Sequence, residues 1–137
     1  MLQLACIIQM VPGWKNSTKL RFFVKNNYEG HSKYWQECLK KLRVDCAIQI
    51  VHWDEENFGP SELDMPSANP DTKRQYFSNV NRFIKTHSEQ SNLLYLYLPS
   101  PSAHTQANVD YLQNLTMMTD QLPPTLLVHG ITDVISV

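Results

Sequence analysis

The spacing of apolar and polar residues changes along the chain and divides it into strands and helices. Two short apolar runs, at 92–99 and 125–130, flank an amphipathic segment at 106–121. Neither run alternates apolar with polar residues, which is typical of strands buried on both faces of a parallel sheet. The segment between them has helical spacing. The pattern therefore predicts a strand–helix–strand unit, around which we expect the rest of the chain to be arranged.

The first half of the chain repeats this order. Residues 19–24 have the composition of a strand, residues 31–43 have apolar positions at helical spacing, and residues 46–53 form a second strand-like run. These three segments predict another unit of two parallel strands joined by a helix. Ahead of them, residues 2–11 predict a buried helix that ends at Pro12–Gly13, followed by Trp14 as a packed aromatic lid.

A polar segment, 54–71, separates the two units and predicts a mobile acidic loop. The amphipathic helix expected at 72–86 follows it, and residues 131–137 form a short tail. The acidic residues of the loop are Asp54, Glu55, Glu56, Glu62, Asp64 and Asp71. The whole pattern predicts one α/β domain, 1–137, folded as a three-layer sandwich with a mostly parallel sheet of about four strands.

Composition narrows the class of protein. The chain has 137 residues, of which 42% are hydrophobic and 18% charged, with a net charge of -1. A net charge this small does not indicate binding to nucleic acid or to an anionic membrane surface. We interpret the one tight basic cluster, Lys40, Lys41 and Arg43, as a solvated helix end. The three cysteines, Cys6, Cys38 and Cys46, form no CxxC pair, so we expect buried free thiols in a reducing compartment.

The start of the chain and its short modification motifs add further expectations. No segment approaches the ~20 apolar residues of a membrane span. The apolar helix pattern begins at Met1 without a capping residue, which indicates a truncation point or an internal methionine with more protein upstream. Asn16 and Asn114 begin glycosylation sequons that we expect to be unused. Residues that could be phosphorylated are Ser17, Thr18, Ser61, Ser67, Thr72 and Ser78.

The carboxyl ends of the predicted strands are where an open parallel sheet would bind a ligand. These positions are Lys25–Asn27, His52–Asp54, Pro99–Ser100 and His129–Gly130. No glycine-rich phosphate loop is present, so nucleotide binding is disfavoured. His52 with Asp54, and His129, could pair as a base and its orienting group, but polar caps of a sheet are the favoured interpretation because no nucleophile elbow accompanies them.

Two further groups could bind ligands. The acidic loop residues could hold a divalent cation, but they lack EF-hand spacing, and a solvated loop is the favoured interpretation. Four aromatic side chains could stack on a ligand, but packing in the core is the favoured interpretation; they are Trp35, Trp53, Tyr95 and Tyr97. We therefore predict no enzyme activity, no catalytic residue, no cofactor-binding residue and no metal ligand.

Several stretches together resemble the C-terminal cytosolic domain of the cation–chloride cotransporters, solute carrier family 12. In that family an aliphatic strand ending in Leu-Pro-x-Pro precedes a helix with a Tyr-Leu-x-x-Leu core, and a Pro-Pro-x-Leu-Leu-Val-x-Gly strand follows. The similar segments here are 1–14, 20–24, 94–101, 111–116 and 122–130. The context of Trp14 and the segment 128–132 are most similar to a divergent branch of the family.

The resemblance implies a regulatory and dimerisation domain, 1–137, on the cytosolic face of a membrane. It implies that this domain is part of a longer, multi-pass membrane protein, the parent protein, which takes part in, or modulates, coupled cation and chloride symport. The parent would form a homodimer and contact other cation–chloride cotransporters, and its membrane contact would run through a transmembrane region that lies outside this chain. No ion-binding residue carries over to these positions.

Two other functions compete with this hypothesis. One is a free-standing α/β module that binds a nucleotide or another small ligand, which a thermal shift on adding ATP would favour. The other is a small hydrolase that depends on His52 or His129. If the sheet is incomplete, an exposed strand edge and an apolar helix face should leave the isolated chain poorly soluble or self-associating.

Overall fold

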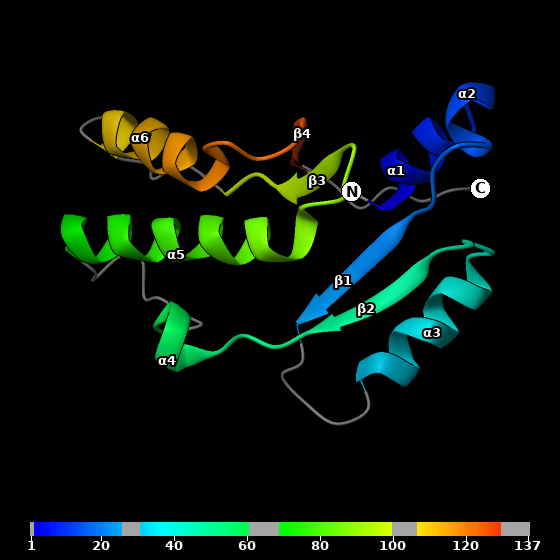
Figure 1. The fold of residues 1–137 in the computed structure, drawn as a ribbon, viewed down its shortest axis with the longest axis horizontal. Helices are drawn as coiled ribbons and strands as arrows, with labels where there is room; N and C mark the ends of the chain where they lie inside the picture. Colours follow the sequence, from blue (N-terminus) through cyan, green and yellow to red (C-terminus); the bar gives the residue numbers. More distant parts are fainter. Residues whose placement is uncertain (1, 26–30, 61–68, 100–106, 130–137) are drawn as a thin grey trace. The chain divides into compact units, whose positions relative to one another are not determined.

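The structure, a computed structural model, describes residues 2–25, 31–60, 69–99 and 107–129. The chain divides into two compact units, Met1–Trp53 and Asp54–Val137 (Figure 1). The first unit contains α1 (Leu2–Gln9), α2 (Pro12–Lys15), β1 (Arg21–Lys25), α3 (His31–Lys41) and β2 (Ala47–Val51). The second contains α4 (Glu55–Phe58), α5 (Pro70–Ser88), β3 (Leu94–Tyr97), α6 (Ala107–Thr119) and β4 (Thr125–Val128).

The first unit contains the predicted pair of parallel strands. Strand β1 pairs with β2 in parallel, with Arg21 opposite Ala47 at one end of the register. Helix α3 connects them and lies against β2. Phe22 of β1 packs edge-to-face on Trp35 of α3, with ring centroids 5.1 Å apart. The strand–helix–strand prediction for this half is therefore confirmed, and its buried apolar side chains are Ala5, Val24, Leu39 and Val51.

Helix α3 ends in a Schellman motif, just before β2. The amide of Val44 donates to the carbonyl of Leu39 at 3.0 Å, and the amide of Arg43 donates to Lys40 at 3.1 Å. Arg43 has a φ of 54°, at the position where glycine is most common. The turn directs the chain back to the beginning of β2, so the basic residues of this helix end lie at the amino end of the strand pair.

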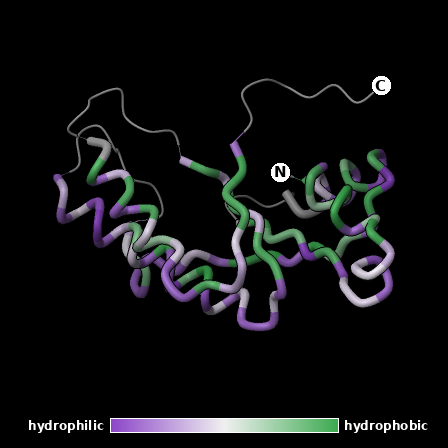
Figure 2. Tube along the Cα trace, turned by 90° about the horizontal axis from the view of Figure 1, so that it is seen from above, coloured by the Kyte–Doolittle hydropathy of each residue, from purple (hydrophilic) through white to green (hydrophobic). Residues whose placement is uncertain are grey.

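The N-terminal helix ends before Pro12, as predicted, because α1 stops at Gln9. Pro12 then begins the separate short helix α2, where a missing N–H costs nothing because the first-turn amides have no partner within the helix. The predicted burial is wrong, because the side chains of Ile7 and Met10 are 63% and 73% exposed and Ala5 is the buried residue of α1. Figure 2 shows this apolar helix close to the N-terminal label.

The second unit repeats the parallel arrangement. Strand β3 pairs with β4, from Leu94 opposite Thr125 to Tyr97 opposite Val128, and α6 connects them. Helix α5 packs along α6. The side-chain amide of Asn81 on α5 donates to the carbonyls of Met118 and Asp120, both at 2.9 Å. These two bonds fasten α5 to the carboxyl end of α6, beside the buried apolar residues Phe77, Leu94 and Met118.

The prediction of a mobile loop over 54–71 is wrong at both ends of the segment, where helices are found. Asp54 caps the short helix α4, and Asn69 caps α5 by accepting a hydrogen bond from the amide of Thr72 at 2.8 Å. Pro70 takes the first position of α5, which suits its fixed φ. Gly59 ends α4 with a φ of 71°, a conformation that side chains disfavour. Residues 61–68 of the loop and the predicted tail at 131–137 lie outside the described residues.

The α/β class is confirmed, since each unit combines helices with parallel strands. In the described residues the strands form two separate two-stranded sheets, β1–β2 and β3–β4, so the single four-stranded sheet of a three-layer sandwich is not confirmed. The expectation that both strand faces are buried is wrong, because Tyr97 and Leu126 are 56% and 38% exposed. Both lie on one face of the β3–β4 sheet, since facing residues of paired strands point the same way.

Candidate functional site

Asp54, the predicted orienting carboxylate, is engaged in capping a helix. One carboxylate oxygen accepts from the amides of Glu56 at 3.0 Å and Asn57 at 3.4 Å. The other accepts from the side-chain amide of Asn57. The hydrogen bond from the Asn57 side chain is the main cause that holds the pKa of Asp54 below its ordinary value, with the two backbone amides adding to it against slight burial. The carboxylate therefore stabilises α4.

The two candidate histidines belong to different units. His52 follows β2 and is exposed. His129 follows β4, and its ring lies 5.5 Å from the ring of Tyr97, between centroids, at a tilt of 51°. Tyr97 and His129 together form an exposed polar and aromatic strand end, which matches the interpretation of these residues as caps of a sheet.

The other strand ends are described only in part. The carbonyl of Pro99, after β3, accepts a hydrogen bond of 2.9 Å from the hydroxyl of Tyr111 on α6. This bond holds the crossover helix to the end of the strand and uses the Pro99 carbonyl structurally. Asn26, Asn27, Ser100 and Gly130 lie outside the described residues.

The described acidic residues that could hold a cation lie at the amino ends of helices. Glu55 and Glu56 lie in the first turn of α4, and Asp71 lies in the first turn of α5, where negative charge favours the helix dipole. Asp71 also pairs with Arg74, N to O at 3.7 Å. In the part of the chain that the structure describes, no three His, Cys, Asp or Glu side chains gather as a metal site would require. Glu62 and Asp64 lie outside that part.

The aromatic candidates are distributed between the two units. Trp35 packs against Phe22 and, with centroids 5.5 Å apart, against Tyr34, so core packing is confirmed for it. Trp53 and Tyr95 are half-buried, whereas Tyr97 is exposed. The packed lid predicted for Trp14 is wrong, because this side chain is 36% exposed on α2.

The described cysteine thiols are free, and the described hydroxyls of Ser17 and Thr18 donate to nearby backbone carbonyls. The three cysteines are free, as predicted, but each is half-buried rather than buried. Burial, and then the neighbouring Cys6 and Asp45, raise the pKa of the Cys46 thiol. The Thr18 hydroxyl donates to the Trp14 carbonyl at 2.8 Å, and the Ser17 hydroxyl donates to that of Gly13. Thr72 and Ser78 are exposed on α5, while Ser61 and Ser67 lie outside the described residues.

Sequence reasoning missed two features. The first is Asn81, whose place on the buried stripe of α5, four residues after Phe77, could have marked it as a polar residue with a structural partner. The second is the division of charge between the units. Met1–Trp53 contains eight Lys and Arg against three Asp and Glu, a net charge of +5, whereas Asp54–Val137 contains four against ten, a net charge of -6. Counting charge for each predicted unit would have found it.

Among the described residues, no helix combines the length and the apolar character that crossing a bilayer requires. Asn114 of the second sequon is only 8% exposed in the folded chain.

The chain is similar to members of one protein family. Residues 55–136 match the family model of Solute carrier family 12. Solute carrier family 12 member 9 of Danio rerio is 35% identical, over 98% of this chain and 15% of that protein. The proteins of the same name from Xenopus laevis and Homo sapiens are 30% and 28% identical, again over 98% of this chain and over 16% and 18% of their own lengths.

These matches confirm the resemblance seen in the sequence. They extend over nearly the whole chain, including the first unit, which the family model leaves out. The chain spans between 15% and 18% of the length of the relatives that it matches. Members of the family are membrane transporters rather than enzymes. The chain belongs to solute carrier family 12.

Proposed function

We propose that this chain is the C-terminal regulatory and dimerisation domain of a cation–chloride cotransporter-like membrane protein. The parent would take part in, or modulate, coupled cation and chloride transport, and this domain would lie on the cytosolic face of the membrane. The observation that carries the proposal is a match over 98% of this chain to only 15–18% of much longer family members. A segment of that size, without a membrane span among its described helices, fits an extramembrane module.

The proposal assigns no chemistry to the described side chains. Asp54 stabilises a helix start and His129 packs on Tyr97, so these two residues have structural roles that need no substrate. The competing hypothesis of a nucleotide-binding module gains no specific support from the described strand ends. Thermal unfolding with and without ATP separates the two, because the proposal expects no shift in the melting temperature.

The proposed dimer contact is the tyrosine face, which we define as the β3–β4 sheet face formed by Tyr95, Tyr97, Leu126 and Val128. Tyr97 is 56% and Leu126 is 38% exposed, whereas Leu94 on the opposite face is only 7% exposed. Parallel sheets are normally covered on both faces, and a two-stranded sheet is marginal by itself. We propose that a second copy covers this face and that the short sheets become part of a three-layer α/β sandwich in the parent.

The dimer contact is tested by replacing one exposed tyrosine with lysine. Tyr97→Lys places a charge on the proposed contact, whereas Tyr34→Lys makes the same change at a 59% exposed site on α3 of the other unit. We expect sedimentation velocity to show a reversible dimer for the unaltered chain and for Tyr34→Lys, and a monomer for Tyr97→Lys. A monomer for the unaltered chain at its highest attainable concentration would contradict the proposed dimer.

The regulatory role needs the parent protein. Chloride-dependent cation flux would be measured in cells that make the parent with Tyr97→Lys or with Tyr34→Lys. We expect Tyr97→Lys to change the flux at equal surface abundance, because it disturbs the contact between copies, and Tyr34→Lys to leave it unchanged. Equal fluxes for both variants and the unaltered parent would show that this face does not regulate transport.

A further inference from the structure

Unit 1, which is Met1–Trp53, concentrates positive charge at one end. The amino ends of β1 and β2 lie side by side, because Arg21 pairs with Ala47 and the amide of Ala47 donates to the Leu20 carbonyl at 2.9 Å. Basic residues reach this region from α2, from the start of β1 and the segment before it, and from the end of α3, and all of them are exposed. We call them the basic end, and they are Lys15, Lys19, Arg21, Lys40, Lys41 and Arg43.

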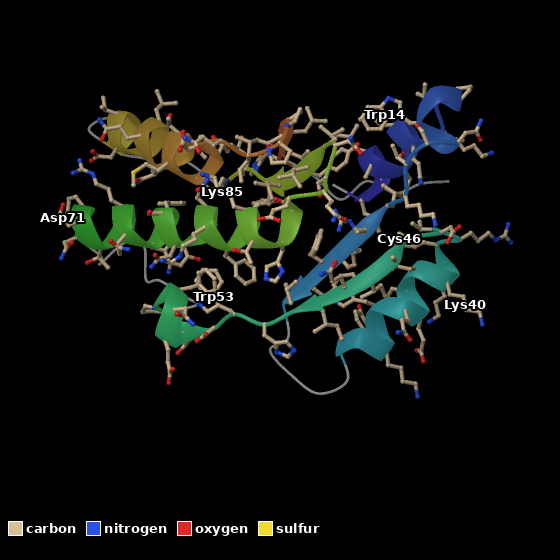
Figure 3. The ribbon with its side chains drawn as sticks, viewed as in Figure 1. Trp14, Lys40, Cys46, Trp53, Asp71 and Lys85 are labelled. Carbon is tan, nitrogen blue, oxygen red and sulfur yellow. The ribbon has the colours of Figure 1, made fainter. Side chains whose placement is uncertain are left out.

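Hydrogen bonds hold these segments together at the basic end. The amide of Thr18 donates to the carbonyl of Trp14 at 2.9 Å, which joins α2 to the approach to β1. The side-chain amide of Gln9 donates to the Thr18 carbonyl at 3.5 Å, which holds the end of α1 to the same place. The Schellman motif at Arg43 fixes the end of α3 just before β2. In Figure 3, Trp14, Cys46 and Lys40 mark this end of the unit.

Exposed apolar side chains accompany the positive charge. Met10, Val11 and Trp14 are 73%, 51% and 36% exposed at the junction of α1 and α2, and Leu42 is 61% exposed at the end of α3. The first acidic residue of the chain is Glu29, so α1, α2 and β1 carry no negative side chain. Asp45, which is exposed between Arg43 and the start of β2, is outnumbered at this end by six basic residues. Apolar side chains and a tryptophan beside lysines and arginines are the combination that binds the interface of an anionic bilayer.

We infer that the basic end of unit 1 docks on the anionic phospholipid surface of the membrane. Charge complementarity selects this occupant, because a unit with a net charge of +5 is attracted to a negatively charged leaflet and the exposed apolar residues can enter its headgroup layer. The inference revises the expectation that membrane contact runs only through a transmembrane region. It does not depend on dimerisation or on transport by the parent.

The test uses the full 137-residue chain and lipid vesicles. Vesicles of phosphatidylcholine alone are compared with vesicles containing about 30% phosphatidylserine, at salt from about 0.05 to about 0.5 M. We expect the chain to co-sediment with the phosphatidylserine vesicles, with binding that weakens as salt rises. Equal binding to both kinds of vesicle, or no binding to either, would overturn the inference.

A matched pair of substitutions locates the contact on α3. Lys40→Gln removes a charge at the basic end, whereas Lys33→Gln removes a charge that is also exposed, near the other end of the same helix. We expect Lys40→Gln to weaken vesicle binding about fivefold and Lys33→Gln to weaken it less than about twofold. Circular dichroism confirms that each variant is folded. Equal losses for the two variants would show diffuse charge attraction and would contradict a docking end.

A second pair tests the apolar contribution. Met10→Asp places a carboxylate among the exposed apolar residues of the basic end, whereas Val109→Asp makes a comparable change at a 64% exposed site on α6. We expect Met10→Asp to remove most of the vesicle binding and Val109→Asp to retain it. Soluble polyglutamate serves as an acidic polymer, and tight binding to it without binding to vesicles would assign the basic end to an acidic protein partner instead.

Discussion

Removing the side-chain amide of Asn81 tests whether the packing of α5 on α6 depends on two buried hydrogen bonds. Asn81 is 8% exposed, and its amide donates to the carbonyls of Met118 and Asp120 at 2.9 Å. Met118 lies in the last turn of α6 and Asp120 directly follows the helix, so both carbonyls are at a helix end, where backbone acceptors have no partner within the helix. Asn81→Ala removes both donors and leaves these carbonyls to find other partners.

The expected cost follows from the surroundings of the two carbonyls. A hydrogen bond contributes about 1 kcal/mol net, and a buried acceptor that is left unpaired costs about 1–3 kcal/mol. Met118 is only 5% exposed, so water cannot easily reach its carbonyl, whereas Asp120 is exposed and water can replace its lost bond. We therefore expect Asn81→Ala to lower the free energy of unfolding by about 2 kcal/mol.

Asn79→Ala on the same helix is the matched control. The side-chain oxygen of Asn79 accepts a hydrogen bond of 3.1 Å from the side-chain amide of Gln75 on the helix surface. Losing this exposed bond should change the free energy of unfolding by less than about 0.5 kcal/mol. Both variants gain the same helix propensity from alanine, and the difference between them isolates the buried bonds. Urea unfolding followed by circular dichroism measures it, because α5 and α6 are the two longest described helices. A difference below about 0.5 kcal/mol would refute the argument.

Three further predictions concern α4 and the thiols. The pKa of Asp54 is lowered in the folded chain, so the stability that its carboxylate contributes is complete above the ordinary pKa of 3.8 and is lost as pH falls through the folded-state pKa. An NMR titration of Asp54 should have its midpoint below 3.8, and a midpoint at or above 3.8 would contradict the capping role. Arg82 donates to the Asn57 carbonyl and lies 5.0 Å from the centroid of the Phe58 ring, so Arg82→Ala should loosen α4 and speed hydrogen exchange of its amides, whereas unchanged exchange would count against this contact. Burial raises the pKa of Cys46, so iodoacetamide at neutral pH should modify it more slowly than an unstructured cysteine peptide, and an equal rate would be inconsistent with that shift.

The strand–helix–strand units could be predicted because their spacing is local. Residues 125–128 and 106–121 show a short apolar run and a helical period in the sequence alone, and the structure has β4 and α6 there. The order of the elements then implied parallel strands, which the register confirms. The resemblance to the cotransporter family also came from such short, ordered motifs, and the comparisons confirm it.

The incorrect predictions concern burial and capping, which depend on contacts between segments. An apolar run such as residues 2–11 shows helical period but does not reveal whether another layer covers it, and Ile7 and Met10 are exposed. The segment at 54–71 was interpreted from its polarity, although Asp54 and Asn69 are good capping residues that begin helices. The net charge of the whole chain concealed the opposite charges of its two units, because the surplus of basic residues in the first nearly cancels the surplus of acidic residues in the second.

The strand-end candidates illustrate the same limit. His52, Asp54 and His129 were placed correctly at or just after strand ends, because strand boundaries could be predicted. What each side chain contacts could not be predicted, since Asp54 accepts from amides two and three residues ahead and His129 meets Tyr97 across the strand pair. Both contacts are made with residues close to the strand ends, and neither could be inferred from the strand boundaries alone.

The central claim is that this chain holds copies of a membrane transporter together. The most direct measurement is co-isolation of two differently tagged copies of the full-length parent from detergent, with and without the segment that corresponds to this chain. We predict that the tagged copies co-isolate when the segment is present and separate when it is deleted, at equal abundance in the membrane. Co-isolation that is equally efficient without the segment would contradict the claim.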